Sequence, residues 1–165
     1  MEIKYNQYTD DQHINKVKAM NLDILDKFEF LLGDWNLEYR IPNSIFSDSG
    51  SDTGMGSFKK ILSDNYVLFE YSTKSGGEAK GIFAWDDKVK IYRYWWFENS
   101  GNYQSATCNF IDDVTLAMNW HDTLLVQTFV KEAPDRVALK MQYPSVQGGY
   151  ELVLEVIFSK KTNAA

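Results

Sequence analysis

The chain has 165 residues, which is enough for one globular domain with its own hydrophobic core. Hydrophobic residues make up 44% and charged residues 24%, the balance of an ordinary globular protein. The formal net charge is −6 and no cluster of Lys and Arg stands out, so a nucleic-acid partner is not expected, because binding to phosphates requires a basic face.

No segment of the sequence predicts a secretion signal or a membrane span. Met1–Met20 is polar and charged, unlike the apolar centre of a signal peptide. The longest apolar runs contain only a few residues, whereas a spanning helix needs about 20. Cys108 is the only cysteine, so the chain can form no internal disulfide. We therefore expect a cytoplasmic protein with no membrane partner.

A short amphipathic helix is predicted ahead of the first strand. Residues 1–20 form a polar lead without a clear period, and we assign the domain to residues 21–165. Across Asn21–Leu32 the apolar side chains recur at helical spacing. Asn21 suits the N-cap, and Gly33 can end the helix in a left-handed turn.

After Gly33 the period of the apolar residues changes to two. Trp35, Leu37 and Tyr39 alternate with polar side chains, which predicts a first strand that runs to Ile41. The next segment, Pro42–Gly56, is rich in Ser, Asp and Gly and is therefore predicted to be a loop.

The rest of the chain reads as short strands separated by turn residues. They are expected at Gly56–Leu62, Tyr66–Ser72, Ala79–Trp85, Val89–Phe97, Tyr103–Ile111, Val114–Trp120, Thr123–Lys131, Arg136–Tyr143 and Tyr150–Lys160. Short links favour antiparallel neighbours, and closure into a barrel removes both edges of the sheet. The expected fold is mainly β, an antiparallel up-and-down lipocalin-like barrel of about ten strands with one short N-terminal helix. A β-sandwich is the alternative.

Short sequence motifs resemble those of lipocalin-like (calycin) proteins. Leu32-Gly33-Asp34-Trp35 resembles the Gly-x-Trp motif that follows a short helix in lipocalins. Taken in order, several pieces resemble the bacterial DUF1579 family, a lipocalin-like group of uncharacterised function. These pieces are Phe28–Trp35, Gly54–Phe58, Gly81–Asp86 and Tyr94–Gly101. The resemblance implies a calycin barrel and no established activity.

The chain departs from related barrels at their known ligand motifs. The later lipocalin motifs are not recognisable. The Arg-x-Tyr clamp of fatty-acid-binding proteins is absent, because Lys140–Tyr143 has neither the Arg nor the spacing. The haem-binding nitrobindin branch needs a His near its C-terminus, and no His follows His121. No cofactor is therefore expected.

The segment Val89–Phe97 is predicted to be apolar on both faces. One face carries Ile91, Arg93, Trp95 and Phe97, and the other carries Tyr92, Tyr94 and Trp96. One of these faces should line the interior, and the other should meet the helix or another subunit. An inward Arg93 would need a carboxylate such as Glu70 or an anionic ligand, whereas an outward Arg93 would stack on neighbouring aromatic rings.

Other candidate residues each allow a structural interpretation as well as a functional one. Trp35 either floors a ligand cavity or plugs the base of the barrel. His121 is a turn residue unless a partner makes it a catalytic base. Gln127 is a polar side chain that could orient a guest, and Cys108 is expected to be a small buried hydrophobe. The ligand-binding candidates are Trp35, Glu70, Arg93, Trp95, His121 and Gln127.

Binding of a small hydrophobic molecule inside the barrel is the favoured functional hypothesis. Two isolated His and one Cys give no metal-ligand spacing, and no nucleophile motif is present. We therefore assign no catalytic residue and no metal site. One alternative is an isomerase or hydrolase acting on a hydrophobic substrate in the same cavity. The other is a homo-oligomeric structural protein, such as a homodimer, with a filled barrel.

Overall fold

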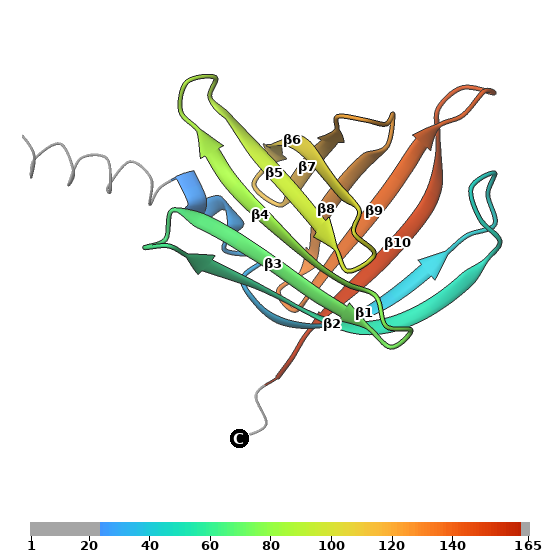
Figure 1. Ribbon diagram of the computed structural model, residues 1–165, viewed down its shortest axis with the longest axis horizontal. Helices are drawn as coiled ribbons and strands as arrows, with labels where there is room; N and C mark the ends of the chain where they lie inside the picture. The colour runs from blue at the N-terminus through green and yellow to red at the C-terminus, as the bar shows by residue number, and fades with distance from the viewer. Residues whose placement is uncertain (1–23, 163–165) are drawn as a thin grey trace, which may run out of the picture.

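In the computed structural model, which describes residues 24–162, ten antiparallel strands close into a barrel (Figure 1). The strands are β1 (Gly33–Ile41), β2 (Gly50–Ile61), β3 (Tyr66–Thr73), β4 (Glu78–Asp86), β5 (Ile91–Glu98), β6 (Tyr103–Asp112), β7 (Thr115–Trp120), β8 (Val126–Ala133), β9 (Arg136–Pro144) and β10 (Tyr150–Lys160). Each strand pairs with the next, and β1 also pairs with β10. The predicted barrel is confirmed, and the β-sandwich is excluded.

The seam between β1 and β10 joins the two ends of the sheet. Its register runs from Trp35 opposite Lys160 to Arg40 opposite Glu155. Because this seam closes the sheet, no strand is left with an unpaired backbone edge.

β2 begins at Gly50 rather than Gly56, so the predicted loop Pro42–Gly56 is wrong in its second half. Residues 50–56 pair with β1 along their whole length. Gly54 is required there because a Cβ atom would collide with the Ser72 carbonyl of β3. The small residues that suggested a loop instead allow two backbones to approach closely.

The predicted helix over Asn21–Leu32 is wrong for most of its described part. Ile24 and Leu25 are helical, Asp26–Phe28 form the 3-10 helix η1, and residues 29–31 are turns. Asn21 and the boundary between residues 20 and 21 lie outside the described residues. Gly33 does adopt the expected left-handed conformation, with φ of +114°.

The η1 segment closes one end of the barrel, at the left in Figure 1. The Phe28 ring lies 5.0 Å from Phe83 and 5.0 Å from Phe110, between ring centroids. The Tyr92 hydroxyl donates to the Ile24 carbonyl at 2.6 Å. We call this end the plugged end. The η1 segment lies where the sequence predicted a short α-helix ahead of the first strand.

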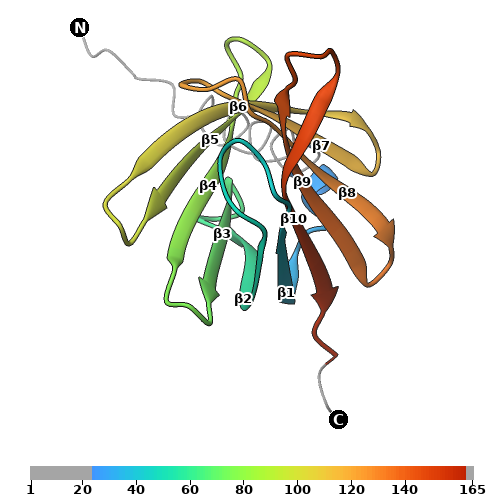
Figure 2. The same ribbon diagram turned by 90° about the vertical axis from the view of Figure 1, so that its right-hand side faces the viewer.

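The opposite end, which we call the mouth, faces the viewer in Figure 2. It is formed by the five links 42–49, 74–77, 99–102, 121–125 and 145–149. The first of these links is held against the barrel wall, because Phe46 packs edge-on against Tyr143 of β9 at 4.7 Å.

The half of the barrel next to the plugged end is filled with aromatic side chains. Phe58 and Phe69 stack at 4.2 Å, and Phe129 and Phe158 meet them within about 6.4 Å. All four are at most 3% exposed. This part of the interior is a packed core and holds the barrel rigid beneath the mouth.

Candidate functional site

The half of the barrel interior next to the mouth contains a cavity of about 250 Å³. Its wall is made by Tyr39, Phe69, Tyr71, Tyr94, Trp96, Glu98, Gln104, Trp120, Gln127, Leu139, Met141, Leu154, Val156 and Phe158. Most of these side chains are aromatic or aliphatic. A concave, mainly apolar wall with a few polar groups is typical of a small-molecule site.

Aromatic rings line the cavity because strand alternation turns every second side chain of β3 and β5 inward. Tyr71 and Trp96 stack with 5.3 Å between ring centroids, and Tyr39 lies 6.0 Å from Tyr71. Burial raises the pKa of Tyr39 and the pKa of Tyr71 above the usual value. Both hydroxyls therefore stay uncharged at neutral pH.

Gln127 is the buried polar side chain of the cavity, at 5% exposure. The Trp120 indole N–H donates to Gln127 Oε1 at 3.2 Å. An indole nitrogen only donates, so this contact fixes which way the amide points. Among residues 24–162, the Gln127 amide nitrogen then meets only the Met118 sulfur, a weak acceptor, at 3.6 Å.

Glu98 ends β5 at the rim of the cavity. Its carboxylate accepts hydrogen bonds from the Trp96 indole N–H and the Ser100 hydroxyl, both at 3.0 Å. The neighbouring link is fixed by Asn99, whose side-chain nitrogen donates to the Gly76 carbonyl at 2.9 Å. The Glu98 carboxylate is therefore held in place at the mouth.

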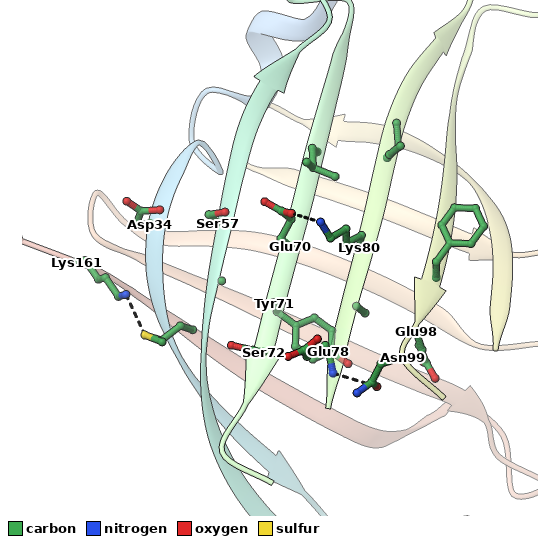
Figure 3. A pocket seen from close by; sticks show the side chains of 16 residues that line it. Asp34, Ser57, Glu70, Tyr71, Ser72, Glu78, Lys80, Glu98, Asn99 and Lys161 are labelled. Atoms are coloured by element: carbon green, nitrogen blue, oxygen red, sulfur yellow. Dashed lines mark hydrogen bonds and ion pairs between the residues drawn. The ribbon is translucent and has the colours of Figure 1, made fainter. Parts of the chain in front are cut away.

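A second hollow of about 720 Å³ lies on the outer surface of β2, β3, β4 and β5, as Figure 3 shows. Glu70 lies in this outer groove and forms ion pairs of 2.8 Å with Lys59 and with Lys80. Hydrogen bonds from both lysines hold the pKa of Glu70 below its usual value. The structure thus places this candidate outside the barrel, with its charge already compensated.

Arg93 and Trp95 also point outward, so of the two orientations considered for Arg93 the structure shows the outward one. Arg93 pairs with Asp86 at 2.7 Å, and its hydrogen bond lowers the pKa of that carboxyl. The partner is therefore Asp86, not Glu70 and not an aromatic ring. Trp95 is 39% exposed on the outer surface. The face that lines the interior carries Tyr94 and Trp96 instead.

His121 lies outside the barrel and is exposed. Its Nδ1 is 2.9 Å from the Ser105 hydroxyl, a contact between two elements that the sequence did not predict. Within residues 24–162, no carboxylate pairs with His121. The Ser105–His121 pair therefore lies on the outer surface and is not part of the cavity wall.

Trp35 plugs the base of the barrel and does not line the cavity. It is fully buried, and its indole N–H donates to the Leu31 carbonyl at 2.7 Å. Gln127 is therefore the one sequence candidate that the structure places in the cavity wall. The cavity wall also contains Tyr39, Tyr71, Glu98 and Trp120, which were not among the candidates. Continuing the inward alternation of β5 by one step would have indicated Glu98.

Cys108, metal ligation and membrane spanning can each be compared with the structure. Cys108 is buried, and burial raises the pKa of its thiol to about 12, which confirms a small buried hydrophobe rather than a reactive thiol. Between residues 24 and 162, no three His, Cys, Asp or Glu side chains are grouped to hold a metal ion. Over the same range, no helix has the length and apolar character needed to cross a bilayer.

No protein-family model matches the chain, and no curated protein matches its sequence. Solved structures share its fold, and two of them serve as examples. Rv2717c from M. tuberculosis matches with a TM-score of 0.58 at 13% identity, over 84% of this chain and 97% of that one. The S-type phycobiliprotein lyase CPES from Guillardia theta matches with a TM-score of 0.50 at 11% identity, over 90% of this chain and 98% of that one. At these identities the likeness shows a lipocalin-like barrel fold and nothing more.

Proposed function

We propose that this protein binds a small hydrophobic molecule inside the barrel, in the cavity beneath the mouth. The observation that carries the proposal is the 250 Å³ cavity, whose mainly apolar wall includes the buried amide of Gln127. A protein that needed only stability would fill this space, because unfilled apolar volume is costly. The rigid plugged end and the open mouth give such a ligand one way in.

Binding of a neutral two-ring fluorescent dye, 6-propionyl-2-(dimethylamino)naphthalene, tests the proposal. Leu154 lines the cavity, so Leu154→Trp should fill it and abolish the rise in dye fluorescence. Ile82 lines the outer groove, and Ile82→Trp is the matched control that should leave dye binding unchanged. Dye binding that survives the Leu154 change and is lost with the Ile82 change would contradict the proposal.

Formation of a homodimer is a second candidate, which is compatible with the first. Trp95 and Phe97 are 39% and 50% exposed on the outer face of β5, and Phe97 pairs across strands with Tyr103, which is 75% exposed. Exposed apolar side chains in a group often mark an interface. Light scattering tests this candidate, and Trp95→Glu should then shift a dimer to the monomer. A mass equal to one chain at all concentrations would contradict it.

An enzymatic role in the same cavity has no observation that favours it, because the Ser105–His121 pair lies outside the barrel. Membership of the DUF1579 family and a cytoplasmic location remain proposals. The family proposal rests on the ordered motifs between Phe28 and Gly101.

A further inference from the structure

The cavity has an unusual balance of charge for a site that takes hydrophobic molecules. Among the described residues that line it, Glu98 is the only charged one, and no Lys, Arg or His contributes. A ligand carboxylate would leave water without meeting a cation, which is costly in a mainly apolar site. It would also approach Glu98, a charge of the same sign.

Glu98 is held as a fixed acceptor at the rim. Its two oxygens accept from Trp96 and Ser100, at 3.0 Å each, which leaves acceptor capacity on both. Burial raises the pKa of Tyr71, and the negative charge of Glu98 raises it further. The Glu98 carboxylate therefore influences a side chain of the cavity wall electrostatically. Rings of Tyr and Trp attract cations, so Tyr71 and Trp96 favour the same ligand charge as Glu98 does.

Deeper in the cavity, Gln127 offers a donor. Trp120 occupies the amide oxygen, and within the described part of the chain the amide nitrogen has only the weak Met118 sulfur as its partner. A buried donor without a good acceptor is costly, and a ligand oxygen would remove that cost. A cavity of about 150 Å³ can hold benzene, so 250 Å³ suits a molecule of one or two rings.

We infer that the cavity selects ring compounds that carry an ammonium group for Glu98 or a neutral oxygen acceptor for Gln127, and that it rejects carboxylates. The inference rests on the proposed function and names the class of ligand for the same site. It separates this barrel from those that clamp a carboxylate with basic residues.

Three probes with the same two-ring skeleton test the inference by titration calorimetry at pH 7. They are 2-naphthylmethylamine, 2-acetylnaphthalene and 2-naphthoate, which are cationic, neutral and anionic. The amine should bind the wild-type protein about ten- to a hundredfold more tightly than naphthoate, and the ketone should bind more tightly than naphthoate as well. Naphthoate binding as tightly as the amine would overturn the inference and leave the proposed function standing. Failure of all three probes to bind would overturn both.

Variants assign the preference to particular groups. Glu98→Gln keeps an acceptor for Trp96 and removes the charge, so the amine and naphthoate should then bind within about threefold of each other. Gln127→Met removes the donor and should weaken the ketone about fivefold while changing the amine less. Glu78→Gln removes an equal charge outside the cavity wall and should change neither preference. An unchanged preference in Glu98→Gln would overturn the role of the rim carboxylate.

Discussion

Gly81 of β4 has no side chain because a ring on the next strand occupies the space beside it. A Cβ atom there would collide with the Tyr94 ring and hydroxyl. Tyr94 cannot move aside, since it is 1% exposed and stacks on Phe83 at 4.2 Å. The position of Tyr94 in the cavity wall therefore depends on Gly81, a residue without a side chain.

Gly81→Ala should lower the free energy of unfolding by about 1–3 kcal/mol, because the added methyl group overpacks the interior. In a Tyr94→Leu background the same change should cost much less, which urea denaturation of the four variants would measure. Gly50→Ala is the matched control, because its Cβ would meet only one atom, at 4.0 Å. Equal costs in both backgrounds would show that Tyr94 is not the obstacle.

Glu70 should make stability depend on pH in the acid range. Its folded-state pKa is lowered by Lys59 and Lys80, so the ion pairs stabilise the fold above the unfolded pKa of about 4.3. That contribution is lost as the pH falls through the folded-state pKa. Glu70→Gln should cost less than about 1 kcal/mol at pH 7, because the lysines are exposed, and the difference should vanish once the pH falls below the folded-state pKa of Glu70. A constant difference across this range would contradict the account.

Single site residues were harder to predict than the strands that carry them. Gln127 was predicted because a polar residue between apolar residues of β8 is a candidate for a buried polar group. Glu98 was missed because it borders a turn, where acidic residues are ordinary. The partners Arg93–Asp86 and Ser105–His121 join residues 7 and 16 positions apart, and such distances follow from strand register, which the sequence alone does not give.

At the scale of elements, η1 should contribute much to stability despite its three residues. Phe28 is fully buried against Phe83, Tyr92 and Phe110. Phe28→Ala should therefore cost about 3–5 kcal/mol of unfolding free energy in urea. Lys27→Ala is the control on the neighbouring exposed position and should change stability by less than about 0.5 kcal/mol. A small effect for Phe28 would mean that the plugged end opens easily.

The strands could be predicted because alternation of apolar and polar side chains records which face is buried. β10 was predicted with its exact bounds, Tyr150–Lys160, and the other strands differ mainly at their ends. The start of β2 was missed because a segment that contains several Gly is usually predicted to be a loop. Here Gly54 is needed instead for the close packing of two strands. The helix was overestimated because the apolar residues Leu25, Phe28 and Leu31 pack into the barrel end from a turn.

At the scale of the whole barrel, as described between residues 24 and 162, only the β1–β10 seam joins strands that are distant in sequence. Closing it late in folding is expected, because long-range contacts require the greater loss of chain entropy. Val156→Ala at this seam should therefore mainly speed unfolding, whereas Val67→Ala in β3 should also slow folding. Stopped-flow measurements in urea would separate the two effects. The unfolding arm of the chevron plot should move for Val156→Ala, and both arms should move for Val67→Ala. A slower folding rate for Val156→Ala would place the seam early.

The two ends of the barrel differ in what a change of sequence can do to them. At the plugged end the η1 segment lies against packed rings, so insertions there would disturb the part that keeps the protein folded. Links at the mouth border the cavity and leave the aromatic core untouched. If the proposed site binds a guest, lengthening or exchanging a rim segment should change which guest it takes while the barrel stays folded.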